Sequence, residues 1–262
     1  MKGFIQSVGA VVMGFMIASA GGTAFAAHPL ITDDAGTQGK GKFQLEVNGQ
    51  YDSDKETVGN VSVKSTGGQA GSTLSYGIID NADLVLNVPY GWGKVTEDGV
   101  STYDEKGLSD ISLEVKWRFF EKDGLSFGLK PGISLPTGNH EKGLGAGKTG
   151  CHLFFIGSKE AAPWAFHANL GYIRNENKFD EEKDLWHASL AAVYEVVKDL
   201  KIVGNVGTER NADKAADNDP AFVIGGVIYS VAENFDLDAG VKYGLTSSET
   251  DLSVMAGAAF RF

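Results

Sequence analysis

The C-terminal stretch, residues 250–262, places the strongest constraint on the fold. Its even-numbered positions from Leu252 to Phe262 are apolar, whereas the intervening positions include Asp251, Ser253 and Arg261. Successive side chains of a strand point to opposite sides, so the stretch predicts a strand with one apolar and one mixed face. An edge strand of a soluble sandwich is one interpretation. The other is the closing strand of a membrane barrel, in which the last strand pairs with the first and removes both edges.

The N-terminal residues have the pattern of a secretory signal peptide. Lys2 supplies the positive charge, residues 8–20 form a short apolar core, and Ala24-Phe25-Ala26 fits the small-x-small cleavage pattern. That core is too short to span a bilayer, and no later apolar run reaches the roughly 18 residues that a transmembrane helix needs. We therefore expect a signal peptide over 1–26, a periplasmic segment over 27–40 and an outer-membrane barrel over 41–262.

The composition excludes several classes of function. The formal net charge is −11, which argues against nucleic-acid binding, because such proteins present a basic surface. Cys151 is the single cysteine of the chain, so an internal disulfide is impossible. The histidines His28, His140 and His152 have no ligand spacing. We expect no cofactor and no bound metal.

Alternating stretches recur along the rest of the chain and predict about twelve strands, the even number that bacterial single-chain barrels have. Long polar connections alternate with short turns, and 52–70 and 93–107 are expected as long loops. Outer-membrane barrels combine long extracellular loops with short periplasmic turns. The sequence therefore predicts an all-β fold, an antiparallel transmembrane β-barrel with both termini in the periplasm.

Four motifs stand out along the chain: H-P-L-I-T-D-D at 28–34 with the G-T-Q-G-K-G-K-F-Q-L-E that follows, L-N-V-P-Y-G at 86–91, G-L-S-D-I-S-L-E-V-K-W-R-F at 107–119 and G-I-S-L-P-T-G at 132–138. They resemble one family of predicted outer-membrane transporters, named for its association with the meta-cleavage pathway of phenol degradation. The resemblance covers most of the chain after the predicted signal peptide. It implies passage of small, aromatic compounds, and it brings no residue-level functional map.

The inward face of the predicted barrel carries charges of both signs. The candidates for this lumen-facing set are Glu46, Glu114, Lys116, Arg118, Lys130, His167, His187, Glu195, Lys242 and Arg261. One hypothesis is a polar conduit or binding cavity, since about twelve strands enclose more space than the filled eight-stranded barrels. The alternative is a lumen packed with paired charges that satisfy one another.

The segment before the first strand has two interpretations. It hangs free, as termini usually do, or it folds back into the lumen as a plug. Asp33 and Asp34 are the candidates for plug contacts, with Lys116, Arg118 or Lys242 as partners. A plug is expected to restrict flow through the barrel.

A passive channel for small organic solutes is the leading functional hypothesis. A closed structural or surface-interaction barrel is the alternative, and a lipid-acting enzyme is a third, because His187-Ala188-Ser189 is similar to the His-x-Ser arrangement of the outer-membrane phospholipase. No orienting acid is evident, so we predict that the protein is not an enzyme. The expected partners are outer-membrane lipids, lipopolysaccharide, a small organic solute and the barrel-assembly machinery, since Phe262 resembles the terminal aromatic which that machinery reads. We expect the acidic clusters of the loops to be solvated surface charges rather than divalent-cation sites.

Overall fold

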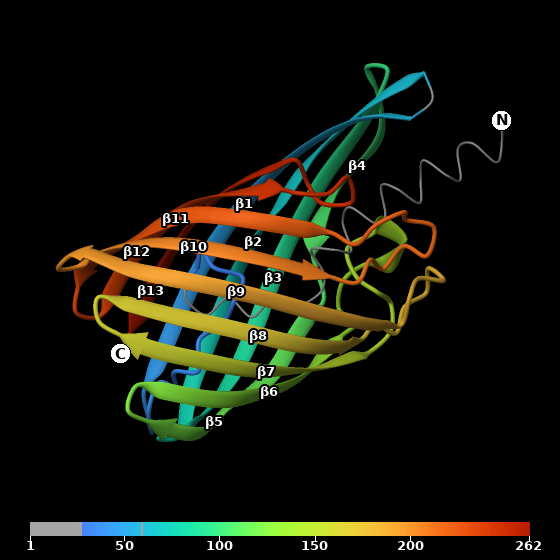
Figure 1. The fold of residues 1–262 in the computed structure, drawn as a ribbon. Coiled ribbons are helices and arrows are strands. Elements are labelled where there is room, and N and C mark those ends of the chain that lie inside the picture. Colours follow the sequence, from blue (N-terminus) through green and yellow to red (C-terminus); the bar gives the residue numbers. More distant parts are fainter. Residues whose placement is uncertain (1–27, 59) are drawn as a thin grey trace.

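The computed structural model describes residues 28–58 and 60–262, which form a closed antiparallel β-barrel of 12 strands (Figure 1). The expected signal peptide lies outside the described residues. No helix among the described residues is long and apolar enough to cross a membrane. One short 3₁₀ helix, η1 (His140–Lys142), lies in the connection after β6.

The strands follow one another around the barrel in chain order. Their bounds are β1 (Phe43–Val58), β2 (Val61–Ile79), β3 (Ala82–Glu97), β4 (Val100–Leu108), β5 (Ile111–Lys122), β6 (Leu125–Leu135), β7 (Gly150–Ala161), β8 (Trp164–Arg174), β9 (Asp184–Val197), β10 (Leu200–Glu209), β11 (Ala221–Ala232), β12 (Phe235–Gly244) and β13 (Leu252–Arg261). β4 and β5 are two parts of one barrel strand, because both pair with β3 and only Ser109 and Asp110 separate them.

The barrel closes between its first and last strands. β1 and β13 pair antiparallel from Gln44↔Arg261 to Ser53↔Leu252. At the end of the seam, the Phe43 N–H donates to the Phe262 carbonyl at 2.8 Å, and the Phe262 N–H donates to the Phe43 carbonyl at 3.0 Å. The two rings stack with centroids 5.4 Å apart. The C-terminal strand therefore removes both sheet edges, as its alternation predicted.

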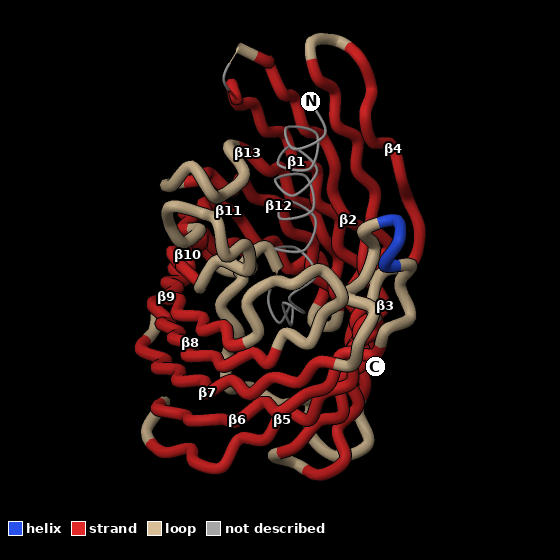
Figure 2. Tube along the Cα trace, turned by 90° about the vertical axis from the view of Figure 1, so that its right-hand side faces the viewer, coloured by secondary structure: helices blue, strands red, loops and turns tan. Residues whose placement is uncertain are grey.

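The prediction of long loops over 52–70 and 93–107 is wrong, because most of these residues belong to strands. β1 and β2 continue to a turn next to residue 59, and β3 and β4 continue to a tight turn at Asp98-Gly99, so the two hairpins rise well beyond the rest of the barrel (Figure 2). β2 has 19 residues, whereas a transmembrane β-strand needs roughly 9–11. The hairpins are rich in Ser, Thr and Lys, which hides the alternation, although Val63 and Val95 are buried on one face. Backbone pairing continues the ladder through this polar sequence.

Exposure alternates along the barrel strands in the sense opposite to that of a soluble protein. On β5, Leu113, Val115 and Trp117 are exposed by 37%, 38% and 44%, whereas Glu114 and Lys116 are buried. The apolar side chains therefore form the outer wall and the charged ones line the lumen. This is the arrangement of a barrel whose outer solvent is lipid.

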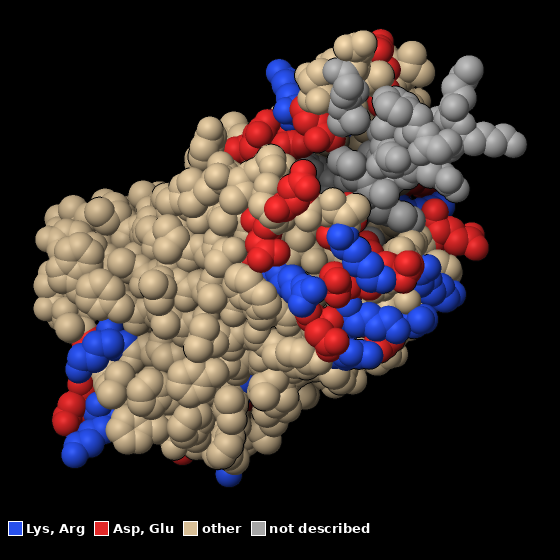
Figure 3. All heavy atoms as spheres, turned by 45° about the vertical axis from the view of Figure 1, so that its right-hand side comes forward, with Lys and Arg blue, Asp and Glu red and all other residues tan. Residues whose placement is uncertain are grey.

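On the face of the barrel that Figure 3 shows, a broad band carries almost no charged residues, and Lys, Arg, Asp and Glu gather at its two ends. Aromatic side chains lie at both borders of this band. Trp164 packs on Tyr194 at the end that carries the short turns, and Tyr172 pairs with Trp186 near the opposite end. Such girdles mark the two membrane interfaces of outer-membrane barrels.

Candidate functional site in the barrel lumen

The N-terminal segment precedes β1, and its residues 28–39 lie inside the barrel (Figure 1). It is tied down first at the end that carries the short turns. The Gly41 N–H donates to the Gly77 carbonyl at 2.8 Å, the Thr37 hydroxyl donates to the Asp80 carbonyl at 2.9 Å, and the Gln38 N–H donates to the Asp83 carboxylate at 3.0 Å. The chain then turns from the wall into the lumen.

Amide and hydroxyl side chains of the wall satisfy the backbone of the buried segment. Asn205 Oδ1 accepts from the N–H groups of Ile31 and Thr32 at 2.8 and 3.1 Å. Asn169 Oδ1 accepts from the Asp33 N–H at 2.7 Å, and its Nδ2 donates to the Asp33 carbonyl at 2.8 Å. Buried peptide groups need such partners, since leaving one unpaired costs about 1–3 kcal/mol. These contacts therefore specify one path for the segment through the lumen.

An ion-pair cluster, which we call the central cluster, joins the segment to β5 and β6. Asp33 lies between two lysines, with Oδ1 2.8 Å from Lys116 Nζ and Oδ2 2.8 Å from Lys130 Nζ. Asp34 lies 3.6 Å from Lys116, and Glu114 lies 3.1 Å from Lys130. Lys116, Lys130, Asp33 and Glu114 are all buried. The cluster is a buried network in which removal of one partner leaves an uncompensated charge.

Small apolar contacts hold the tip of the segment. Leu30 is fully buried against Ala191 and Val203. Pro29 fits against the wall because two residues there lack a side chain: a Cβ at Gly226 would lie 2.6 Å from Pro29 Cγ, and one at Gly240 would lie 2.7 Å from Pro29 Cβ. His28 contacts Asp238 on β12. The tip therefore depends on both apolar burial and close backbone approach.

The structure brings several of the predicted lumen residues together and places others at the barrel ends. Glu46, Glu114, Lys116, Lys130 and His187 are buried on the inner face. His167 is half-buried and its Nδ1 lies 2.9 Å from Ser158 Oγ. The remaining cations pair locally: Lys242 with Glu249 at 2.7 Å, Arg261 with Asp236 at 2.7 Å and Arg118 with Glu121 at 3.1 Å. Glu195 follows the inward alternation of β9 but is exposed, because it lies where the strand leaves the barrel.

Sequence reasoning missed the neutral residues that clamp the segment. Ser158, Asn169 and Asn205 fall on inward positions, and we singled out charged positions instead. Ser158 Oγ accepts from the Ala35 N–H at 2.9 Å, so it belongs to the same set as the two asparagines. A search of the inward alternation for uncharged polar side chains between apolar neighbours would have found Asn169, which lies between Ala168 and Leu170. Ser158 lies between Gly157 and Lys159 and gives no such signal.

His187 and Ser189 form a hydrogen-bonded pair inside the lumen, and the acid that the sequence did not identify is Glu209. His187 Nε2 lies 3.0 Å from Ser189 Oγ, and His187 Nδ1 lies 3.2 Å from Glu209 Oε2. The order of groups matches that of a nucleophile, a base and an orienting acid. His187 and Ser189 are buried on the lumen side, away from the lipid-facing wall. Any lipid substrate at the outer wall is therefore out of their reach.

The acidic loops at the end opposite the short turns contain ion pairs. Lys214 binds Asp180 at 2.6 Å and Arg210 binds Glu182 at 3.2 Å, which ties loop 175–183 to loop 210–220. The hydrogen bond from Lys214 lowers the pKa of Asp180, whereas burial raises the pKa of Glu181. No group of three or more His, Cys, Asp or Glu residues within the described part of the chain is arranged to hold a metal ion.

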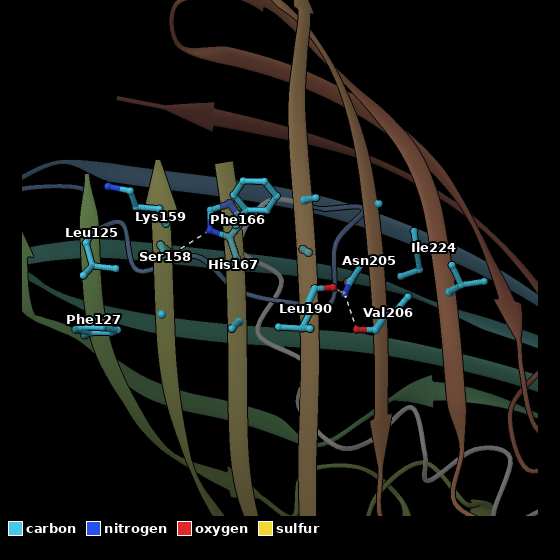
Figure 4. Close-up of a pocket in the computed structure, with 16 residues that line it drawn as sticks. Leu125, Phe127, Ser158, Lys159, Phe166, His167, Leu190, Asn205, Val206 and Ile224 are labelled. Carbon is cyan, nitrogen blue, oxygen red and sulfur yellow. Dashed lines mark hydrogen bonds between the residues drawn. The ribbon is translucent and has the colours of Figure 1, made fainter. Parts of the chain in front are cut away.

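A groove of about 550 Å³ lies on the outer wall rather than in the lumen (Figure 4). Small outward residues, among them Gly157, Ala168, Ala192 and Gly204, form its floor, and Phe127, Phe166, Leu190 and Val206 border it. Leu190 is 60% exposed in this groove. Because its walls are apolar and face the membrane band, the groove is part of the lipid-contacting surface and not a solute path.

The family follows from a match over most of the chain. Residues 32–262 match the model of the family described as "putative MetA-pathway of phenol degradation". The chain belongs to this family. No curated protein matches the sequence.

Solved structures confirm the barrel architecture of this family member. The outer membrane channel COG4313 from Pseudomonas putida F1 is similar with a TM-score of 0.68 and 15% identity, over 87% of this chain and 98% of that one. The NanC porin follows with a TM-score of 0.54 and 10% identity over 82% and 98%. The translocator domain of the autotransporter NalP from Neisseria meningitidis has a TM-score of 0.53 and 14% identity over 98% of both chains. These likenesses establish that the chain has the fold of an outer-membrane barrel.

Proposed function

We propose that the protein is a passive outer-membrane channel for small organic solutes, with its termini and short turns in the periplasm. The observation that carries the proposal is the inverted wall: apolar side chains face outward, and a buried polar lining faces a lumen around a docked N-terminal segment. A polar interior inside a closed barrel provides a path on which a solute keeps hydrogen bonds while it crosses the apolar band. Three barrels of channel, porin and translocator type share the architecture, which supports this reading.

Aromatic compounds are the solute class that we favour. The description of the family refers to phenol degradation, and such a pathway needs its substrate to enter the cell. Within the membrane we expect contacts of the outer wall with lipid and lipopolysaccharide, and recognition of Phe262 by the barrel-assembly machinery.

Swelling of liposomes that contain the purified protein tests the proposal. Liposomes loaded with an impermeant polymer should swell in isotonic amino acids or sugars, and more slowly as solute size increases. Liposomes with a heat-denatured sample serve as the control. Absence of swelling with every solute would contradict the channel.

A closed structural barrel is the second candidate, and one observation favours it. The docked segment crosses the lumen and buries Leu30, Thr32 and Asp33. If it leaves no path, planar bilayers will show no single-channel steps with the full protein. Single-channel current steps that occur with the protein and are missing from bilayers without it favour the channel.

The Ser189–His187–Glu209 arrangement raises a catalytic alternative, which we reject in favour of a lumen hydrogen-bond network. The backbone of β9 pairs with β8 and β10 around these residues, so its N–H groups are engaged in the sheet and not free to stabilise an oxyanion. Incubation with a fluorescent phospholipid should release no product. Hydrolysis that Ser189→Ala abolishes would contradict this assignment.

A further inference from the structure

The docked N-terminal segment changes the charge balance at the centre of the lumen. Asp33 contacts both Lys116 and Lys130, and Asp34 lies near Lys116. The segment therefore neutralises both lysines of the central cluster. Glu114 binds Lys130 as well, so the barrel wall also contributes negative charge to the same cations.

Glu46 is an acidic group of the inner wall that has no ion-pair partner among the described residues. It is 3% exposed on the inner face of β1. Gln44 Nε2 donates to Glu46 Oε1 at 2.7 Å, whereas Glu46 Oε2 is buried and has no hydrogen-bond partner in the described structure. This oxygen can accept a hydrogen bond from a solute.

The inner wall of β1 and β2 has open space at Gly71, one inward position along from Glu46. Gly71 is on the inward face of β2 and pairs with Asn48, the next inward residue after Glu46. A Cβ at Gly71 would meet no atom within 4 Å. Further along β1, Asp52 is buried with Gln50 as its hydrogen-bond donor, at 2.6 Å, and with no cationic partner in the described part of the chain.

With the segment docked, the centre of the lumen holds two buried lysines and the carboxyl groups of Asp33, Asp34, Asp83, Glu114 and Glu46. Without the segment, the carboxyl groups of Asp33 and Asp34 are absent. Charges in a narrow, weakly screened lumen act strongly on passing ions. The docked state therefore presents more negative charge than the undocked state.

We propose that the docked N-terminal segment makes the lumen selective for cations and hydrogen-bond donors, with Glu46 as the specificity-determining residue. Anionic solutes such as aromatic carboxylates meet the uncompensated carboxyl groups and are rejected. Hydroxyl and ammonium groups of a solute donate to Glu46 instead. The inference rests on the proposed channel function and assigns the charge class of its solutes.

Reversal potentials in planar bilayers with a KCl gradient test the inference. The wild-type channel should pass K⁺ several-fold better than Cl⁻. Glu46→Gln should move the permeability ratio toward one. The double variant Asp33→Asn and Asp34→Asn, which removes the two carboxylates of the segment, should move the permeability ratio to about one. Asp180→Asn, in an exposed loop pair with Lys214, is the matched control and should leave the ratio unchanged.

Swelling with two permanently charged aromatic probes gives a second measurement that needs no variant. Liposomes with the wild-type protein should admit benzyltrimethylammonium several-fold faster than benzenesulfonate. A conducting channel that prefers Cl⁻ and benzenesulfonate overturns this inference and leaves the channel function intact. A ratio that is the same in wild type, Glu46→Gln and the double variant also overturns it. Absence of conductance in the folded wild-type protein overturns the channel and this inference together.

Discussion

Asp33 is the residue on which the lumen structure depends most directly. It bridges Lys116 and Lys130 at 2.8 Å each, while its own backbone is held by Asn169. Because each lysine is buried, its charge needs the carboxylate as a partner. A single acidic side chain of the N-terminal segment therefore fixes the position of two cations on different strands.

Leu30→Ala should loosen the segment without removing a charge. Leu30 is fully buried, so truncation loses apolar contact and leaves a cavity, at a cost of about 2–5 kcal/mol. Amide hydrogen exchange should become faster at Thr32 and Asp33. Thr37→Ala, which removes one hydrogen bond at the entry of the segment, is the control with a smaller expected effect. Unchanged exchange after Leu30→Ala would mean that polar clamps alone hold the segment.

Within each strand, the face on which a residue lies decides whether a charged side chain is tolerated there. β5 presents Leu113 to lipid and Glu114 to the lumen, where Glu114 contacts Lys130 and His152. The inner and outer faces of one strand therefore follow opposite rules for charge. The same strand shows why an inward position is not always permissive, since Glu114 is packed within an ion-pair cluster.

Leu113→Arg should impair barrel stability, because a cation on the lipid-facing wall costs about 2–4 kcal/mol near the bilayer midplane. Gly71→Arg is the matched control, since Gly71 faces open space on the inner wall and its new side chain remains in a polar lumen. Urea unfolding in lipid bilayers measures both variants. Equal stability of the two would contradict the facing assignment.

Deletion of residues 29–40 should raise single-channel conductance. The segment occupies the lumen, and its removal opens the space that Leu30, Thr32 and Asp33 fill. The strands from β1 onward keep their pairing, so the barrel should still assemble. Bilayer recordings compare the deletion with the full protein, and an unchanged conductance would show that the segment does not limit flow.

For the whole molecule, closure of the barrel is the decisive event. The seam between β1 and β13 runs along the length of β13, and the stacked rings of Phe43 and Phe262 lie at its end. Closure satisfies the last unpaired backbone groups, which a membrane cannot hydrogen-bond. The last residue of the chain therefore contributes to both pairing and aromatic packing at the seam.

Removal of Phe262 should reduce the amount of assembled barrel in the outer membrane. Two backbone hydrogen bonds and one ring stack with Phe43 are lost. Membrane fractionation and the heat-dependent gel shift of folded barrels measure the effect. Phe260→Leu, which keeps the terminal residue and the backbone pairing, is the control. Normal assembly without Phe262 would contradict a role for the terminal aromatic.

The sequence by itself determined the barrel class and the facing of its strands. A period of two is visible locally, so Leu113 and Glu114 could be assigned to opposite faces without any tertiary information. The exposed side chain of Leu113 and the buried side chain of Glu114 confirm this assignment. Asp33 and Lys116 were also named as partners, because a buried lumen requires opposite charges to meet.

Tertiary structure decided the contacts that join distant positions and the length of the hairpins. Asn205 holds Thr32 across 173 residues, and Lys130 reaches Asp33 only because β6 lies beside β5. No local sequence pattern encodes a contact between residues so far apart in the chain. Residues 52–70 and 93–107 have the polar composition of loops, yet backbone pairing holds β1 to β4 together, and Val63 and Val95 are buried on one face of the hairpins. Strand pairing depends on the register of the whole sheet, and that register is a property of the closed barrel.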